Sequence, residues 1–225
     1  MNYELKDIDT EDIEDLLFKV EKSFGIKFGE AELVHITNFG ELCDYIVNKI
    51  QLDHSNDCTT QQAFYKFRDA ISSKFEIDKK SISTDFLLID LFPRQNRRKM
   101  TAELEKHLGF KLNILRPPHW ETTILSISLL VSFVGLFFYW KIGVSGLILS
   151  IIGLWLSNKT GEELKVQTVG QVAEKMTREN YLKSRRNPKT FNKEEIEKVL
   201  TDWFCNDLGL DKNKLNRDAK LAKER

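Results

Sequence analysis

The chain has 225 residues with 34 acidic and 34 basic side chains, so its formal net charge is zero. It has no basic stripe interleaved with aromatic residues, and no nucleic-acid partner is expected. It also lacks a glycine-rich phosphate loop, a nucleophile elbow and a zincin signature, and its three cysteines and four histidines form no metal-ligand set. We therefore predict a protein that is not an enzyme, with no catalytic residue and no metal.

The first predicted soluble region, residues 1–56, is acidic and contains two amphipathic helices. The first helix follows Asp9 and Thr10, and its apolar residues recur at i, i+3, i+4 and i+7 until Gly25 ends it. Asp9 or Thr10 can cap this helix, and acids in its first turns suit the positive end of the helix dipole. These acids are Glu11, Asp12, Glu14 and Asp15. Asn38 is expected to cap the second helix.

The second predicted soluble region begins with residues 57–118 and is basic. An apolar stripe predicts a helix that ends near Phe75, and Pro93 can open another that continues to Gly109. Four cations lie at the start of this later helix: Arg94, Arg97, Arg98 and Lys99.

Residues 119–158 are predicted to form a two-helix transmembrane hairpin. The two apolar segments are Thr122–Trp140 and Ile142–Leu156. Neither contains a charged residue, and only Lys141 lies between them. At roughly 1.5 Å per residue the first segment nearly matches a hydrocarbon core of about 30 Å, whereas the second is short. The alternative is a buried helical hairpin of a soluble protein.

Charge and small residues refine this prediction. Basic residues flank the hairpin on both sides, so the positive-inside rule predicts an integral protein of the inner (cytoplasmic) membrane with both termini in the cytoplasm. Ser128 and Ser132, like Gly146 and Ser150, are small residues spaced by four, which favours close helix approach in lipid. We expect them to pack against each other within the hairpin.

Three segments follow the hairpin. Residues 159–180 contain a predicted helix capped by Thr168, and residues 181–191 are predicted to be a polar linker. The cations of this linker, Arg185, Arg186 and Lys189, are expected to be solvated or to contact anionic headgroups. In residues 192–225, Asn192 and Glu195 predict a capping box at the start of a last amphipathic helix.

Internal repeats indicate how these segments combine. The segment 21–28 recurs as 105–112, and 39–46 recurs as 169–176. The second copy holds 46 more residues between its landmarks, because the hairpin is inserted there. A third correspondence makes the last helix equivalent to the first helix of the second region. We therefore predict that residues 192–225 complete the first region by circular permutation, or else swap into another copy as a homo-oligomer.

The landmarks of these repeats resemble acyl carrier proteins. The matching pieces are Leu208-Gly-Leu-Asp211, Phe24-Gly-Ile26, Ile36–Leu42 and Thr168–Val172. The resemblance implies an all-α fold of two acyl-carrier-like small helical bundles in tandem, the first circularly permuted, with the hairpin inserted in the second. Module one is residues 1–56 with 192–225, and module two is residues 57–118 with 159–180.

The sequence departs from the family at the residue that carries its function. The family attaches phosphopantetheine to a serine after an aspartate at the start of the second helix. Here Asp9-Thr10-Glu11 and Pro93-Arg94-Gln95 occupy that place. Thr10 keeps a hydroxyl and is the candidate attachment residue, although capping is the commoner role of a threonine there. No phosphopantetheine or other cofactor is expected.

The resemblance also implies partners. The family docks through its acidic second helix, and Glu11, Asp12, Glu14 and Asp15 preserve that face in module one. Module two presents Arg94, Arg97, Arg98 and Lys99 instead. These cations are predicted to dock an acidic face, either that of module one or that of a separate acidic carrier protein, or else to be a solvated helix end. A lipid-synthesis enzyme is a further expected partner of the protein.

We thus expect a non-catalytic, membrane-anchored docking scaffold associated with lipid or fatty-acid metabolism. The alternatives are an acyl carrier with a non-standard attachment residue and a small pore or transporter subunit. The second alternative would need an ionisable residue within the membrane, which the hairpin lacks.

Overall fold

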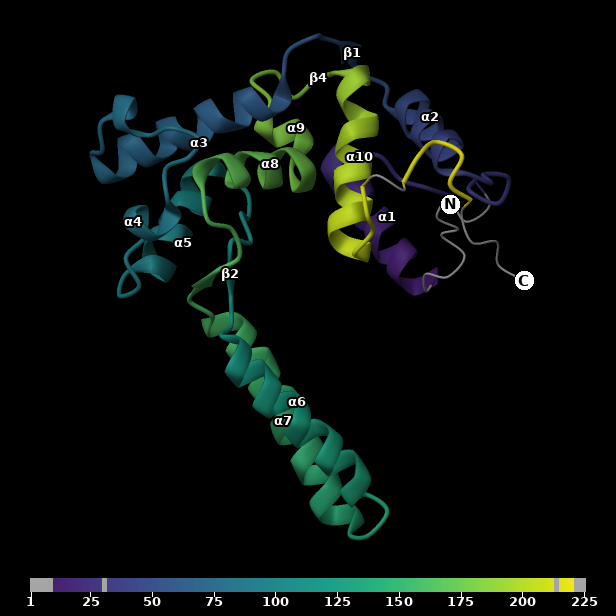
Figure 1. Ribbon diagram of the computed structural model, residues 1–225, viewed down its shortest axis with the longest axis vertical. Helices are drawn as coiled ribbons and strands as arrows, with labels where there is room; N and C mark the ends of the chain where they lie inside the picture. Colours follow the sequence, from purple (N-terminus) through teal and green to yellow (C-terminus); the bar gives the residue numbers. More distant parts are fainter. Residues whose placement is uncertain (1–9, 30–31, 213–214, 221–225) are drawn as a thin grey trace. The chain divides into compact units, whose positions relative to one another are not determined.

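The computed structural model describes residues 10–29, 32–212 and 215–220 (Figure 1). Most of these residues lie in helices, and the named strands among them are only two residues long. The predicted all-α class is therefore confirmed. The chain forms two compact units. Unit 1 contains the described parts of Met1–Ser73 and Ala173–Arg225, and unit 2 is Lys74–Val172.

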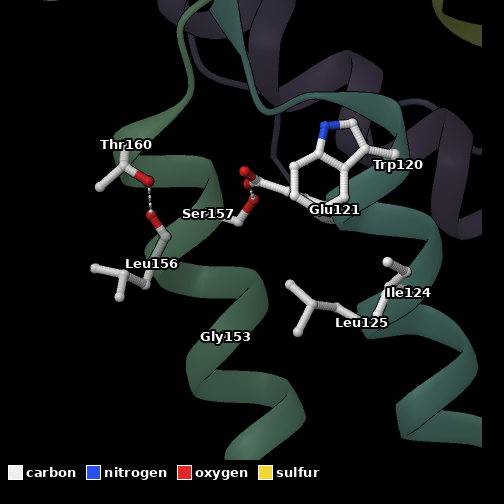
Figure 2. A pocket seen from close by; sticks show the side chains of 8 residues that line it. All are labelled: Trp120, Glu121, Ile124, Leu125, Gly153, Leu156, Ser157 and Thr160. Atoms are coloured by element: carbon white, nitrogen blue, oxygen red, sulfur yellow. Dashed lines mark hydrogen bonds between the residues drawn. The ribbon is translucent and has the colours of Figure 1, made fainter.

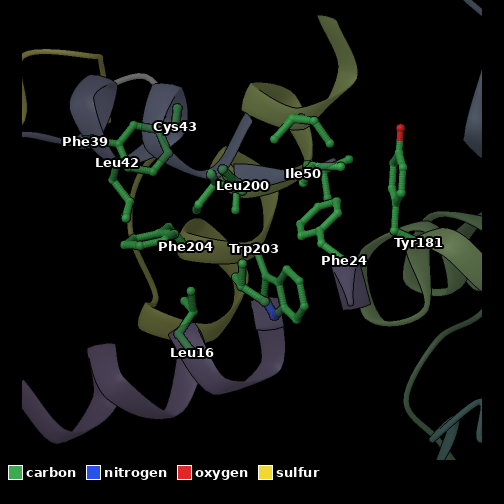
Figure 3. Close-up of a cluster of buried hydrophobic side chains, with 14 of the residues drawn as sticks. Leu16, Phe24, Phe39, Leu42, Cys43, Ile50, Tyr181, Leu200, Trp203 and Phe204 are labelled. Atoms are coloured by element: carbon green, nitrogen blue, oxygen red, sulfur yellow. The ribbon is translucent and has the colours of Figure 1, made fainter. Parts of the chain in front are cut away.

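Unit 1 is built around three long helices that come from opposite ends of the sequence. These are α1 (Thr10–Phe24), α2 (Phe39–Lys49) and α10 (Lys193–Leu208). Their apolar faces meet in one core, in which the rings of Phe39 and Phe204 lie 5.0 Å apart (Figure 3). Trp203 is only 1% exposed in this core. The last helix thus packs on α1 and α2 of its own chain, while its interpretation as a circular permutation stays a prediction.

The remaining elements of unit 1 are short, apart from α3 (Thr59–Phe75), whose last two residues belong to unit 2. They are β1 (Asp53–His54), α9 (Tyr181–Ser184), β4 (Thr190–Phe191) and the part of α8 (Val169–Glu179) that follows Val172. β1 and β4 pair in parallel. Residues 217–220 return to the start of α2, where the N–H of Phe39 donates to the carbonyl of Ala219 at 2.9 Å.

Helix ends in unit 1 follow the capping rules. The side chain of Asn38 accepts a hydrogen bond from the N–H of Glu41 at 2.8 Å, as predicted. Gly25 follows α1 with φ of +65°, a left-handed conformation that suits glycine. Asn192 accepts from the N–H of Glu194 at 3.1 Å. Glu195, however, accepts from the N–H of Thr59 at the start of α3 instead of completing a capping box, so that detail of the prediction is wrong.

The predicted polar linker, residues 181–191, is wrong at several positions. Tyr181 and Arg185 are buried, at 0% and 1% exposure. The Arg185 guanidinium donates to the Thr59 hydroxyl and to the carbonyl of Asp57, and lies 3.9 Å from the carboxylate of Glu195. These acceptors replace water around the charge of Arg185. Part of the segment predicted to be solvated therefore lies in the interior of unit 1.

Unit 2 contains a small core and the helical hairpin. Its elements are η2 (Lys79–Ser81), α4 (Leu88–Leu91), α5 (Arg97–Leu108), β2 (Leu115–Arg116), α6 (His119–Gly135), α7 (Trp140–Thr160), β3 (Glu163–Leu164) and the first four residues of α8. Thr168 accepts from the N–H of Gln171 at the start of α8, as predicted. β2 and β3 pair antiparallel, Leu115 opposite Leu164 and Arg116 opposite Glu163. The chain therefore enters and leaves the hairpin at the same point.

Candidate functional site

The hairpin of α6 and α7 is the feature of the chain with the strongest functional signal. The two helices lie side by side along their lengths and are joined by a turn at residues 136–139 (Figure 1). α6 has 17 residues and α7 has 21, or about 26 and 32 Å at 1.5 Å per residue. Within the part of the chain that the structure describes, α7 alone is long and apolar enough to cross a membrane by length and composition.

The predicted lengths of the two segments are thus wrong in opposite directions. α6 ends at Gly135, five residues before the predicted end, whereas α7 continues through Ser157 to Thr160. The reason is that the polar side chains in this extension find partners within the hairpin. Ser157 donates to the carboxylate of Glu121 at 2.8 Å, and Thr160 donates to the carbonyl of Leu156 at 2.9 Å.

The interface between α6 and α7 is made of small residues. The hydroxyls of Ser150 and Ser128 are 3.0 Å apart. A Cβ added at Gly146 would lie 2.3 Å from the Ser132 hydroxyl, and one added at Gly143 would lie 2.6 Å from the backbone nitrogen of Leu136, directly after α6. The two predicted small-residue pairs therefore pack against each other within the hairpin, as expected.

The outer surface of the same hairpin is made of large apolar side chains. Ile127, Val131 and Leu149 are 55%, 66% and 69% exposed, and many neighbours are similar. The other exposed members are Trp120, Ile124, Leu130, Phe133, Val134, Phe137, Phe138, Tyr139, Trp140, Ile142, Val144, Ile148, Ile151, Ile152, Trp155 and Leu156. The hairpin thus has small and hydroxyl-bearing residues inside and bulky apolar residues outside, which is the reverse of a water-soluble helix pair.

Aromatic and basic side chains concentrate at the two ends of the hairpin. Near the base, Lys159 lies over the ring of Trp155 at 4.9 Å, and Trp120 is exposed on α6. At the tip, Lys141 lies over the ring of Trp140 at 5.9 Å. Amphipathic rings and long cationic side chains at both ends of an apolar segment are typical of the two interfaces of a bilayer.

A shallow pocket of about 340 Å³ opens between the two helices at the base (Figure 2). Its lining residues are Trp120, Glu121, Ile124, Leu125, Gly153, Leu156, Ser157 and Thr160. Glu121 is its one charged lining residue, half-buried and bonded to Ser157. Sequence reasoning missed this pair, because a glutamate before one apolar segment and a serine after another show no relation until the helices fold together.

The four predicted docking cations of module two do not act alike. Arg97 is only 6% exposed, donating through Nε to the carbonyl of Phe92 at 2.9 Å and through a terminal nitrogen to that of Glu162 at 2.6 Å. Burial, followed by the charge of Arg94, lowers the pKa of Arg97. Its assignment as a surface docking residue is therefore wrong, because it fastens the start of α5 to the segment after α7.

The other three cations are exposed. Arg98 donates to the carbonyl of Lys159 at 3.3 Å, in the last turn of α7. Arg94 lies four residues before Arg98 and Lys99 directly after it, and both are also exposed. The structure therefore places Arg98, at the start of α5, next to the base of the hairpin.

In unit 1 the predicted acidic face lies on the exposed side of α1. Glu11, Asp12, Glu14 and Asp15 are all exposed. Phe18 follows them on the same helix and is 67% exposed, an unusual position for a phenylalanine. Asp9 lies outside the described residues. α1 begins at Thr10, but the side chain of this candidate attachment residue is not among those described.

Among the described residues, no group of three or more histidine, cysteine, aspartate or glutamate side chains is arranged to hold a metal ion. Cys43 is buried, and this burial raises the pKa of its thiol to about 12, whereas Cys58 is exposed.

Comparison of the chain with protein-family models, curated proteins and solved structures gave no match.

Proposed function

We propose that the α6–α7 hairpin is embedded in the cytoplasmic membrane as an antiparallel pair of spanning helices. The observation that carries this proposal is the reversed distribution of side chains, with small residues between the helices and bulky apolar residues on the outside. Lipid tails can cover such a surface without loss, whereas water cannot. The helices bond their own backbone groups, as lipid requires.

The two helix lengths suit a bilayer of ordinary thickness. α7, at about 32 Å, can cross a core of about 30 Å with little tilt. α6, at about 26 Å, needs the turn at the tip to complete the crossing, and the aromatic residues 137–140 are suited to that interface. Basic residues are more numerous at the base than at the tip, where Lys141 is the single cation. This asymmetry favours a cytoplasmic base and cytoplasmic termini.

On the cytoplasmic side, the protein is proposed to act as a non-catalytic docking scaffold. Unit 1 also holds most of α3 and of α8, which the sequence assigns to module two, so the two acyl-carrier-like modules remain an expectation of the sequence. The support for docking is that the exposed acidic residues of α1 precede the exposed ring of Phe18 on the same helix. An exposed aromatic side chain on a charged helix face is a common feature of a protein contact. The partner expected for this face is a protein with a complementary basic surface, such as a lipid-synthesis enzyme.

Cysteine labelling of bacterial spheroplasts tests the membrane topology. The variant Cys205→Ser retains Cys58 as a reporter on unit 1, since Cys43 is buried, and Phe138→Cys adds a reporter at the tip. A membrane-impermeant maleimide should label Phe138→Cys in intact spheroplasts and Cys58 only after lysis. The protein should also resist extraction at alkaline pH. Release by alkali, or labelling of neither site before lysis, would contradict a spanning hairpin.

A second measurement separates the scaffold from an acyl carrier. The purified full chain is incubated with coenzyme A and a phosphopantetheinyl transferase, and its intact mass is measured. An unchanged mass is expected for a scaffold. A phosphopantetheine adduct that disappears in Thr10→Val would instead establish a carrier that uses this threonine.

A further inference from the structure

Three exposed cations lie at the base of the hairpin or a few residues along the chain from it. These are Arg94, Arg98 and Lys159, which we call the basal cation cluster. Arg98 reaches the carbonyl of Lys159 at 3.3 Å, and the charge of Arg94 acts on Arg97, the next arginine along the chain. Within the described residues none of the three forms an ion pair, whereas their neighbour Arg116 lies 3.8 Å from the carboxylate of Glu163.

The cluster has a defined level relative to the hairpin. Arg98 contacts the last turn of α7, and Lys159 lies over Trp155, one turn earlier. Trp120 and Thr160 line the same pocket, so the start of α6 is at this level too. If the hairpin spans the bilayer, these tryptophans mark the cytoplasmic interface. The basal cation cluster is then at the depth of the phospholipid phosphates.

We infer that the basal cation cluster binds the headgroups of anionic phospholipids. This inference rests on the proposed membrane insertion and adds a lipid specificity to it. Guanidinium groups suit phosphate oxygens, because their planar N–H donors match the acceptor geometry. The acids at this level are already engaged: Ser157 donates to Glu121, and Glu163 faces Arg116. The charge of Glu162 acts on the buried Arg97, whose pKa it raises against the larger effect of burial.

The cluster fits a lipid surface better than an acidic protein. Arg98 is held against the end of a membrane helix, so a folded partner would have to approach at the level of the headgroups. Arg98 lies in the first turn of α5, at the positive end of the helix where acids would be favoured for helix stability, and Arg94 shortly precedes it. An anionic surface opposite them offsets this repulsion.

Quenching of tryptophan fluorescence by brominated lipids tests the inference. The full chain carries Trp140→Phe and Trp155→Phe, leaving Trp120 at the base and the buried Trp203 of unit 1. It is reconstituted in phosphatidylcholine vesicles that contain the same mole fraction of either brominated phosphatidylglycerol or brominated phosphatidylcholine. The anionic quencher should be about twofold or more enriched around Trp120, and the triple variant Arg94→Gln, Arg98→Gln, Lys159→Gln should show a ratio near one.

The matched control removes three exposed lysines of unit 2 that lie elsewhere in the sequence, with Lys74→Gln, Lys80→Gln and Lys106→Gln. This control should keep the wild-type ratio. Quenching by neutral brominated lipid should be equal in all variants, which shows that each is folded and inserted.

The outcomes are distinct. Equal quenching by the two lipids in the wild type, or an unchanged ratio in the triple variant, overturns the inference while membrane insertion stands. Loss of the preference on addition of inorganic phosphate also overturns it, because the cluster would then bind free phosphate. No quenching by either lipid overturns both the inference and the proposed insertion.

Discussion

The glycines of α7 set how closely the two hairpin helices approach, and Gly143→Ala tests this directly. A Cβ at Gly143 would lie 2.6 Å from the backbone nitrogen of Leu136, while ordinary contact begins at 3.4 Å. A backbone atom cannot rotate away, so the start of α7 and the turn at Leu136, directly after α6, must separate locally by about 0.8 Å. Overpacking of this kind costs about 1–3 kcal/mol.

A disulfide across the hairpin measures this strain in membranes. Ser128→Cys and Ser150→Cys replace hydroxyls that are 3.0 Å apart, in a chain whose three native cysteines are changed to serine or alanine. A disulfide needs Cβ atoms about 3.5–4.5 Å apart, so closing it restores the clash in Gly143→Ala. The equilibrium constant for forming this disulfide in a glutathione buffer should therefore fall roughly 5- to 100-fold. This range is the overpacking cost of about 1–3 kcal/mol converted at about 1.4 kcal/mol for each factor of ten.

Other glycines of the hairpin provide graded controls. A Cβ at Gly153 would meet only the flexible end of Leu125, at 2.7 Å, and one at Gly135 would meet nothing closer than 3.9 Å. Gly153→Ala should therefore have a small effect, and Gly135→Ala almost none. An unchanged disulfide equilibrium in Gly143→Ala, or equal losses at all three glycines, would refute the proposed close packing.

Two further predictions concern the soluble parts. Arg97→Met should lower the stability of the detergent-solubilised protein by about 2–4 kcal/mol, because the carbonyl of Glu162 is left without its charged donor. Thermal unfolding followed by near-ultraviolet circular dichroism measures this loss. A loss of stability no greater than that of the exposed variant Arg98→Gln would contradict the prediction. Glu32 has a pKa lowered from 4.5 to about 2, first by its bond from Lys49, so its stabilising effect is present above pH 4.5 and is lost as the pH falls towards 2. The stability difference between wild type and Glu32→Gln in urea unfolding should therefore shrink between pH 5 and pH 2, and a difference independent of pH would disprove the assignment.

Local patterns in the sequence were enough to predict several elements. Asn38 caps α2 and Gly25 follows α1 with a left-handed backbone, because both effects depend on residues a few positions apart. The small residues of the hairpin face each other for a similar reason, since spacing by four puts them on one side of each helix. The helical character and the self-packing of the hairpin could therefore be read from the sequence.

The ends of the hairpin helices could not be predicted in the same way. Ser157 and Thr160 are polar, so a count of apolar residues stops before them. In the structure Ser157 bonds to Glu121, which is 36 positions away, and the helix continues. A polar side chain therefore need not end an apolar helix when the neighbouring helix supplies a hydrogen-bond partner.

The arginines show the same limit more strongly, and they explain why charge alone misled. Arg97 and Arg185 stand in basic runs that are typical of solvated surface. Each is nevertheless buried, because its acceptors include carbonyl groups that the sequence does not mark. The acceptors of Arg97 and Arg185 include carbonyls 65 and 128 positions away. Arg98, next to Arg97, keeps an exposed guanidinium beside the end of α7. Adjacent, chemically identical residues thus divide into one that is buried and fastens α5 to the segment after the hairpin, and one that stays exposed at the end of α7.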